Sequence, residues 1–345
     1  MGMTEKPKIV VLTPVKNEAW ILPRFLATTS LWADKIIIAD QNSSDESVQI
    51  CKRFDKVVLI RNESPIYDEA ERQLLLIKTA RELISGPRIL FALDADEILA
   101  ANALETAGWQ KILKAQPGTA VLLEKPDLYL SPKNCIRWRD KPFPIAYVDD
   151  GSAHHPIAIH SVRIPLSENT PRLVLDDVKV LHYAWANPSL QESKMRYYSV
   201  VENVRSVSPP VRRRLRYSRK FLESFKPKME SSERSWFQSW EEKNIDMLTI
   251  PSCEYTWHDL EILRHFSGSG TKRFYWDDIW YVNWEERRQY ALKMGFSGVP
   301  TQPIQQPAEI DQRFRNLCAD AFSMMRQTRE RLRSALKGDS SKSRQ

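Results

Sequence analysis

The sequence predicts an α/β fold, in which a mostly parallel, Rossmann-like sheet is flanked by helices and followed by a helical C-terminal extension. Two observations over residues 8–125 support this prediction. Short, continuous apolar runs alternate with longer segments whose apolar residues recur at helical spacing. The runs also lack the polar–apolar alternation of strands with one face in water. We therefore expect strands that are buried on both faces, as in parallel sheets covered by helices.

The expected elements follow in order along the chain. The strands are continuous apolar runs at residues 9–12, 35–39, 56–60, 89–93 and 120–123. The helices between them have apolar residues at helical spacing and lie at residues 20–32, 46–54, 69–84 and 103–114. Gly86-Pro87 follows the third helix and is a strong signal for helix termination.

The rest of the chain changes character. Residues 126–180 mix prolines, aromatics and histidines with short β-like pieces such as 157–164, and one more strand is expected at 178–183. Helices are expected at 190–207 and 310–336, before a polar tail. We expect a catalytic-type α/β domain at residues 1–187, a mainly helical region at 188–337 and a disordered tail at 338–345.

Composition limits the class of protein. The chain has 345 residues, 42% of them apolar and 28% charged, with a net charge of +7, which is ordinary for a soluble protein. No apolar run is long enough to span a membrane, and the short polar N-terminus resembles neither a signal nor a transit peptide. Four scattered cysteines without a C-x-x-C pair predict a reducing compartment, with no zinc site and no disulfide framework. We therefore expect a cytoplasmic protein.

Asp94-Ala95-Asp96-Glu97 is the most informative motif, because it comes directly after the apolar run 89–93. Carboxylates separated by one residue at the end of a buried strand are costly unless a positive charge compensates them. A hard divalent cation with a phosphate on its far side is the usual solution. The alternative is a solvated acidic turn that opens a helix after Ile98.

Two further polar clusters follow strands in the same way, at residues 13–18 and 40–45. Ligands of open α/β sheets bind outside the carboxyl ends of the strands, so the three clusters should share one edge. The chain has no Gly-rich phosphate loop of the G-x-G-x-x-G or P-loop kind, which argues against a dehydrogenase or a P-loop enzyme. Phosphates would instead be held by a metal or by basic side chains such as Lys16 and Arg72, although exposed basic residues are mostly just solvated.

These motifs resemble the family-2 glycosyltransferases with the GT-A fold. The family pattern is a strand ending in P-x-x-N-E, a strand ending in D-x-x-S-x-D and a D-x-D, matched here by residues 10–18, 36–45 and 93–97. The resemblance covers roughly residues 8–185. It departs at Gln41-Asn42, where the family often has Asp-Gly. His182-Tyr183, at the end of a strand, resembles a subgroup in which a histidine completes the metal site.

The resemblance implies a metal-dependent, hexosyltransferase-like enzyme that moves a sugar, with inversion, from a nucleotide-diphosphate donor to a hydroxyl acceptor. The cofactor would be Mn²⁺ or Mg²⁺, bound by Asp96 and His182. Glu18 and Asp40 would face the ribose and base, and Asp94 the ribose or the water shell of the metal. The residues expected to contact substrates are Pro14, Glu18, Asp40, Asp45, Asp94 and His155. The acceptor would be a saccharide or a lipid-linked molecule, and no nucleic-acid partner is expected.

Three of these roles have structural alternatives. Glu18 could simply be an acidic residue in the first turn of a helix. Asp45 belongs to a Ser-Ser-Asp run that is a good helix N-cap. His182 could be a core histidine with satisfied hydrogen bonds.

The resemblance does not identify the proton acceptor. An inverting transfer needs a carboxylate that takes the proton of the acceptor hydroxyl. Asp150 is the preferred base, because it lies in a loop beside His154-His155, in the segment expected to line the acceptor cleft. Asp176 and Asp177 are carboxylate alternatives that lead into a strand, and His155 and His160 are alternatives as base or substrate binder.

Two features of the C-terminal third have open interpretations. A basic run from Arg205 to Lys220 is typical of a solvated helix face, a peripheral surface for the inner face of a membrane or, with least support, a nucleic-acid patch. Trp276, Trp280 and Trp284 recur every four residues, which favours a packing stripe over a sugar-stacking site. Two rival functions also stay open, a non-catalytic nucleotide-sugar-binding or interaction protein and a nucleotidyltransferase. The Gly-rich, Arg-containing N-terminal loop usual for the latter is absent.

Overall fold

The computed structural model describes residues 5–62, 68–137, 142–157, 161–218, 227–251 and 256–342. The chain forms two compact units. The first contains Met1–Pro188 and Pro227–Ser252, and the second contains Ser189–Lys226 and Cys253–Gln345. Residues 227–251 thus belong to the first unit, although the sequence suggests that they continue the helical region.

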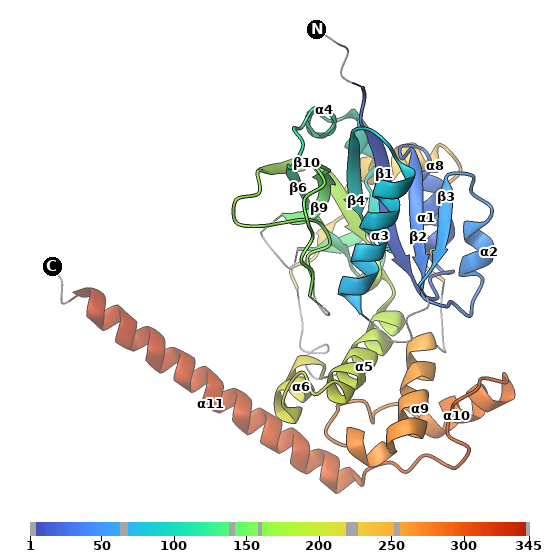
Figure 1. The fold of residues 1–345 in the computed structure, drawn as a ribbon. Coiled ribbons are helices and arrows are strands. Elements are labelled where there is room, and N and C mark those ends of the chain that lie inside the picture. The colour runs from blue at the N-terminus through green and yellow to red at the C-terminus, as the bar shows by residue number, and fades with distance from the viewer. Residues whose placement is uncertain are drawn as a thin grey trace. The chain divides into compact units, whose positions relative to one another are not determined.

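A large mixed sheet forms the centre of the first unit, so the predicted α/β class is confirmed (Figure 1). Its central strands, in spatial order, are β3 (Val57–Arg61), β2 (Lys35–Asp40), β1 (Lys8–Val15), β4 (Arg88–Ala92), β9 (Phe143–Val148), β6 (Ala120–Glu124) and β10 (Arg172–His182). Strands β3, β2, β1 and β4 are mutually parallel, and β10 is parallel to β6. Strand β9 is antiparallel to both of its neighbours.

Short strands extend the sheet beyond β10. They are β7 (Asp127–Leu128), β8 (Asn134–Ile136) and β11 (Glu230–Ser231). Strand β5 (Glu97–Leu99) pairs antiparallel with the end of β10, so that Glu97 lies opposite His182. Glu97 therefore begins a strand, whereas the sequence suggests the first turn of a helix.

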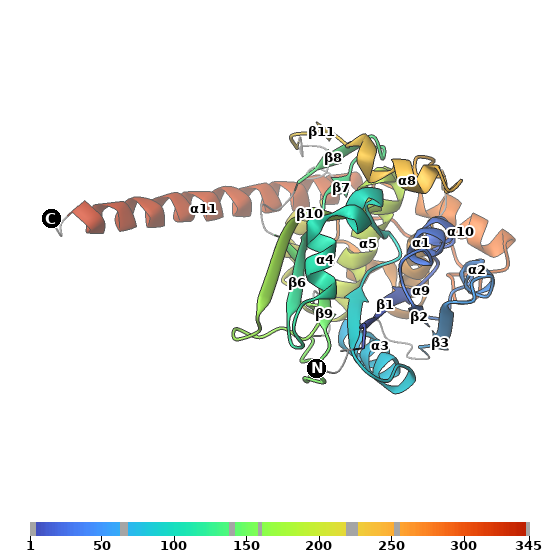
Figure 2. The same cartoon turned by 90° about the horizontal axis from the view of Figure 1, so that it is seen from above.

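Helices cover both faces of the sheet (Figure 2). The first unit includes helices α1 (Leu22–Thr29), α2 (Ser47–Cys51), α3 (Glu69–Leu83) and α4 (Ala107–Leu113), and the short helix η1 (Ala101–Glu105). The core on the α1 and α4 face includes Phe25, Phe91 and Trp109. On the opposite face, Leu76 of α3 packs with Leu12 of β1. The apolar runs therefore have no polar face because both faces of the strands are buried.

The region after β6 differs most from the expected pattern. Strand β9 has no counterpart among the predicted strands, and the β-like piece at 157–164 is not a strand at Ile157 or at 161–164. Strand β10 begins at Arg172, before the predicted start, and has an irregular register near Asp177. Residues 234–241 form η3 (Arg234–Trp236) and α8 (Gln238–Glu241), whose tryptophans enter the core of the first unit.

The second unit is helical. It is built from α5 (Pro188–Val204), α6 (Pro210–Arg216), α9 (Trp257–Ser269), η4 (Thr271–Phe274), α10 (Trp284–Lys293) and α11 (Glu309–Lys342). Its core includes Val200, Phe266 and Trp284, and Trp280 stacks on Phe266 with ring centroids 5.4 Å apart. Trp280 and Trp284 therefore have a packing role, although Trp280 lies in a turn before α10. Helix α11 continues to Lys342, into the segment for which the sequence predicts disorder.

Part of the basic run is structural. Arg213 and Arg214 are buried rather than solvated, and Arg213 forms an ion pair with Asp277. Arg214 donates hydrogen bonds to Asn316 and Gln312 of α11. Arg212 and Arg216 are exposed, and the part of the run from 219 onward lies outside the described residues. Among the helices that the structure describes, none is long and apolar enough to span a bilayer.

Candidate functional site

The three polar clusters predicted after β1, β2 and β4 meet at one edge of the sheet. The parallel register places Val15 beside Asp40, and Leu93 N donates to Leu12 O over 3.1 Å. Asn17, in a left-handed conformation with φ of 55°, accepts a hydrogen bond from Ser44 N at 2.7 Å. The loops after β1 and β2 are therefore tied directly to each other.

Asp45 and Glu18 contribute to this connection. The Asp45 carboxylate accepts hydrogen bonds from Ala19 N (3.0 Å) and Ser47 N (2.9 Å). These bonds agree with the helix-capping alternative for Asp45 and leave its predicted contact with substrate as a proposal. Glu18 N donates to Ser47 Oγ, and Glu18 Oε2 accepts from Trp20 Nε1 at 2.8 Å.

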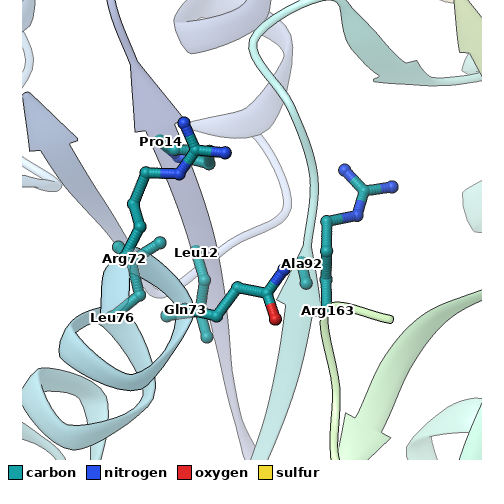
Figure 3. A pocket seen from close by; sticks show the side chains of 7 residues that line it. All are labelled: Leu12, Pro14, Arg72, Gln73, Leu76, Ala92 and Arg163. Atoms are coloured by element: carbon teal, nitrogen blue, oxygen red, sulfur yellow. The ribbon is translucent and has the colours of Figure 1, made fainter. Parts of the chain in front are cut away.

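A small pocket, partly open to solvent, lies on the α3 face of this edge (Figure 3). Its lining residues come from β1, α3, β4 and the segment before β10, and they are Leu12, Pro14, Arg72, Gln73, Leu76, Ala92 and Arg163. Leu12, Leu76 and Ala92 supply apolar walls, whereas two guanidinium groups and one amide supply hydrogen-bond donors. This combination suits a ligand with a flat apolar body and anionic or carbonyl groups.

Side chains outside the pocket orient two of its polar groups. Arg72 Nη1 donates to Gln41 Oε1 over 2.7 Å. Gln41 belongs to the loop in which the sequence departs from the family pattern, and Arg72 of α3 is its hydrogen-bond partner. The Gln73 carbonyl oxygen lies 2.8 Å from His154 Nε2. Because a carbonyl oxygen only accepts, His154 donates and the Gln73 amide NH₂ is left for other partners. Burial, assisted by His155 and Arg81, lowers the pKa of His154 to about 4.

The two acidic residues at either end of the Asp94–Glu97 motif are neutralised by basic side chains. Arg163 lies 3.0 Å from Asp94 Oδ1 and 2.8 Å from Glu97 Oε2, and Lys125 Nζ lies 2.8 Å from Glu97 Oε1. Burial alone would raise the pKa of the Glu97 carboxyl, but Arg163 and Lys125 hold it well below its usual range. Asp94 remains 44% exposed. Glu97 is therefore a buried structural anion, while Asp94 stays accessible.

Asp96 and His182, the two predicted metal ligands, lie together. His182 Nε2 is 3.7 Å from Asp96 Oδ2, and His182 Nδ1 is in hydrogen-bond contact with Asp127 Oδ1. An ionised carboxylate can only accept, so the Asp127 contact favours a proton on Nδ1. In the neutral tautomer with its proton on Nδ1, the lone pair of Nε2 is directed toward the Asp96 carboxylate.

This donor set fits a divalent cation. Ligands that are each about 2.1 Å from one cation lie roughly 3–4 Å apart, and the 3.7 Å separation falls in that range. A carboxylate behind the histidine is the usual support of a metal-bound imidazole. Within the described ranges, no group of three or more His, Cys, Asp or Glu side chains is arranged to hold a metal. A cation here would take its remaining ligands from water and substrate.

The predicted base, Asp150, lies at the opposite edge of the sheet, and the prediction does not fit this placement. Strand β9 is antiparallel to β4, and Asp149 N donates to Arg88 O at the start of β4. Six residues at about 3.3 Å each separate Arg88 from Asp94, which is roughly 20 Å. Asp150 instead accepts hydrogen bonds from Tyr147 Oη (2.7 Å) and Ser152 N (2.9 Å).

The two carboxylate alternatives lie within β10, several residues before His182. Asp177 lies within β10, where its Oδ2 accepts from Gly108 N at the start of α4. Asp176 precedes it on the same strand, six residues before His182. His155 is exposed in the segment after β9, and its predicted contact with substrate stays a prediction. His160 lies outside the described residues.

The sequence analysis missed two residues of the site. Asp127 follows β6 at the same edge, so the rule applied to the first, second and fourth strands would have identified it if extended to this one. Arg163 gives no local signal, because it is a lone basic residue in a segment without regular structure. Its presence could be inferred only from the need to neutralise Asp94 and Glu97.

Comparisons with known proteins give structural likenesses only. No family model matches the sequence, and no curated protein matches it. A structure of GalNAc-T7 with UDP, GalNAc and Mn²⁺ aligns at a TM-score of 0.37 and 12% identity over 52% of this chain. TarS 1–349 of S. aureus in complex with UDP aligns at 0.36 and 15% over 84% of this chain and 79% of TarS 1–349. A 4-diphosphocytidyl-2C-methyl-D-erythritol synthase aligns at 0.30 and 10% identity, over 50% of this chain and 89% of the synthase.

The chain spans 44% of the GalNAc-T7 chain, which is less than half of its length. At TM-scores below 0.5, these likenesses are too weak for an activity to be inferred from them. The site described above therefore rests on its own geometry.

Proposed function

We propose that this protein is a metal-dependent glycosyltransferase that uses a nucleotide-diphosphate sugar as donor. The observation that carries the proposal is the placement of Asp96 and His182, backed by Asp127, at the same sheet edge as the pocket beside β1. A cation-type donor set beside a pocket with apolar walls and guanidinium groups matches a ligand that combines a flat base with a diphosphate.

The charged side chains at this edge of the sheet form two groups, and only one of them would need a bound cation. Glu97, Asp94, Arg163 and Lys125 sum to zero net charge, so they need no further counter-ion. Asp96 and Asp127 instead place two carboxylates beside His182, whose imidazole can carry at most one positive charge. This second group is therefore negative, and a Mn²⁺ or Mg²⁺ ion would compensate it.

The residues of the chain have distinct roles in this proposal. Asp96 and His182 hold the cation, and Asp127 keeps the imidazole in the metal-binding tautomer. Bound there, the cation would stabilise the negative charge that develops on the leaving diphosphate. Arg72 and Gln73 orient the nucleotide in the pocket, where Pro14 and Leu12 form one wall. Asp40, buried beside the pocket edge, and Asp94, which is accessible, are placed for the ribose. An inverting course and a saccharide or lipid-linked acceptor belong to the proposal through the family resemblance, and a cytoplasmic location belongs to it through the scattered cysteines.

Thermal-shift measurements with a panel of nucleotide sugars, with and without Mn²⁺, test the donor. A ligand that binds only the folded chain raises its stability by mass action. We expect at least one nucleotide sugar to stabilise the wild type only when Mn²⁺ is present. Asp96→Asn should lose this effect, whereas Asp150→Asn is a matched control at the opposite edge and should retain it. A panel in which no member stabilises the wild type would refute the proposal.

Product analysis separates the proposal from its two rivals. A glycosyltransferase releases a nucleoside diphosphate from the donor. A nucleotidyltransferase instead joins a nucleoside triphosphate to a sugar phosphate, and pyrophosphate leaves the triphosphate. Metal-dependent stabilisation without either product, with saccharide and lipid-linked acceptors supplied, would point to a non-catalytic nucleotide-sugar-binding protein.

A further inference from the structure

Helix α11 has an apolar stripe on the side that faces away from its own unit. Its described residues are Ile310, Phe314, Leu317, Ala321, Met325 and Thr328. From Phe314 onward they follow a 3-4-4 spacing, which continues in the sequence at Leu332 and Leu336. Ile310 is 76% exposed, Phe314 63%, Leu317 68% and Met325 64%. These are large apolar side chains in water, on a single straight helix (Figure 1).

The opposite side of α11 is already occupied. Gln312 and Asn316 accept hydrogen bonds from Arg214 of α6, and Arg315 lies over the ring of Tyr275 at 5.6 Å. Ala319 is buried. At about 100° per residue, this docking side and the stripe point in directions about 180° apart. The stripe therefore plays no part in attaching α11 to its own unit.

The spacing of the stripe indicates what covers it. A 3-4-4 pattern repeats every 11 residues, or about 3.67 residues per turn, so it stays on one side of a nearly straight helix. The stripe is also narrow, with charged residues such as Arg313 and Asp320 beside it. A narrow seam is typical of helix–helix pairing, whereas helices that lie on membranes need a wider apolar face.

The charges along α11 favour an antiparallel partner with the same sequence. Residues 309–320 carry three acidic and two basic side chains, for a net charge of −1, whereas residues 321–342 carry six basic and two acidic ones, for a net charge of +4. Two copies in parallel would bring the two strongly basic halves together. Two antiparallel copies instead place each basic half against a weakly acidic one.

We propose that α11 is a self-association helix, and that the protein dimerises by pairing its α11 stripe antiparallel with the stripe of a second copy. Each partner buries the same residues, as expected for a two-fold symmetric interface. This inference does not depend on the proposed enzymatic function, since α11 contributes no residue to the site at the sheet edge.

Sedimentation velocity of the full chain tests the proposal. We expect the wild type to be a dimer at micromolar concentration, and Phe314→Glu/Leu317→Glu and Met325→Glu to weaken dimerisation at least tenfold. Both variants replace exposed side chains, so the fold, checked by circular dichroism, should be unchanged. Met294→Glu is the matched control, because Met294 is 57% exposed but lies outside the stripe. This variant should dimerise like the wild type.

Three outcomes would overturn the proposal. The first is a monomeric wild type at every concentration, and the second is a Phe314→Glu/Leu317→Glu variant that dimerises as tightly as the wild type. The third is a monomer that binds anionic phosphatidylserine vesicles through the stripe, which would make a membrane its occupant.

Discussion

His182 Nε2 lies 3.7 Å from Asp96 Oδ2, at the end of β10 and beyond the end of β4 respectively. The two strands are not neighbours in the sheet, because β9 and β6 lie between them. The contact is possible because β5, which starts at Glu97, pairs antiparallel with the last residues of β10. A three-residue strand thus brings the D-x-D motif to the histidine.

Asp127→Asn should weaken Mn²⁺ binding about 10–100-fold while leaving the fold intact. The amide retains the shape of the side chain but removes the charge that holds the His182 proton on Nδ1, and loss of such support typically has this effect. Calorimetric titration with Mn²⁺ measures the change. Asp176→Asn, on the same strand as His182 but exposed and distant from its end, is the control and should bind Mn²⁺ within about twofold of the wild type. Equal affinity in Asp127→Asn and the wild type would contradict the role of Asp127.

Glu97→Gln should destabilise the protein by about 3–5 kcal/mol, because it leaves the charge of Lys125 without its partner and leaves the buried charge of Arg163 with Asp94 alone. Urea denaturation near neutral pH measures the loss. Glu82→Gln removes an exposed pair with Lys78 and should change stability by no more than about 0.5 kcal/mol. If Glu97→Gln were as stable as Glu82→Gln, the ion cluster would not be a structural support of the motif.

Asp150→Asn should leave sugar transfer within about twofold of the wild type. The carboxylate lies at the edge of the sheet opposite Asp96, too far to take a proton from an acceptor placed beside the donor site. Steady-state assays of nucleoside diphosphate release measure the effect. A loss of a hundredfold or more, with donor binding retained, would restore Asp150 as the base and would require a different acceptor geometry.

His154 should make stability depend on pH between about 4 and 6.5. Its pKa is lowered to about 4 in the folded chain, against an ordinary value near 6.5 when unfolded. The unfolded chain therefore binds a proton at higher pH than the folded chain, and stability falls as the pH drops through this range. Urea denaturation at about pH 5 and pH 7 should show a smaller difference for His154→Gln than for the wild type. His155→Gln, which changes an exposed neighbour, should keep the wild-type difference. The same difference in stability between the two pH values in all three proteins would show that His154 is not its source.

Local patterns in the sequence are enough to predict much of the sheet. Apolar runs between helical segments predict β1, β2, β3, β4 and β6 close to their observed bounds. Because parallel strands end at a common edge, the positions of Asp40, Asp94 and Asp96 at one edge follow from the pattern alone. His182 was predicted beside Asp96 only through a family resemblance.

Which charges meet, and where the segment after β9 runs, depend on long-range packing. The sequence places Asp150 beside His154-His155. The edge of the sheet at which Asp150 lies depends on the direction of β9, which runs antiparallel to its neighbours β4 and β6. Arg163 reaches Glu97 across 66 residues of sequence, and Asp127 reaches His182 across 55. Periodicity reports only the surroundings of neighbouring residues, whereas strand direction and ion pairing arise when distant segments pack together. The local pattern therefore located the edge of the site, and long-range packing selected the side chains that complete it.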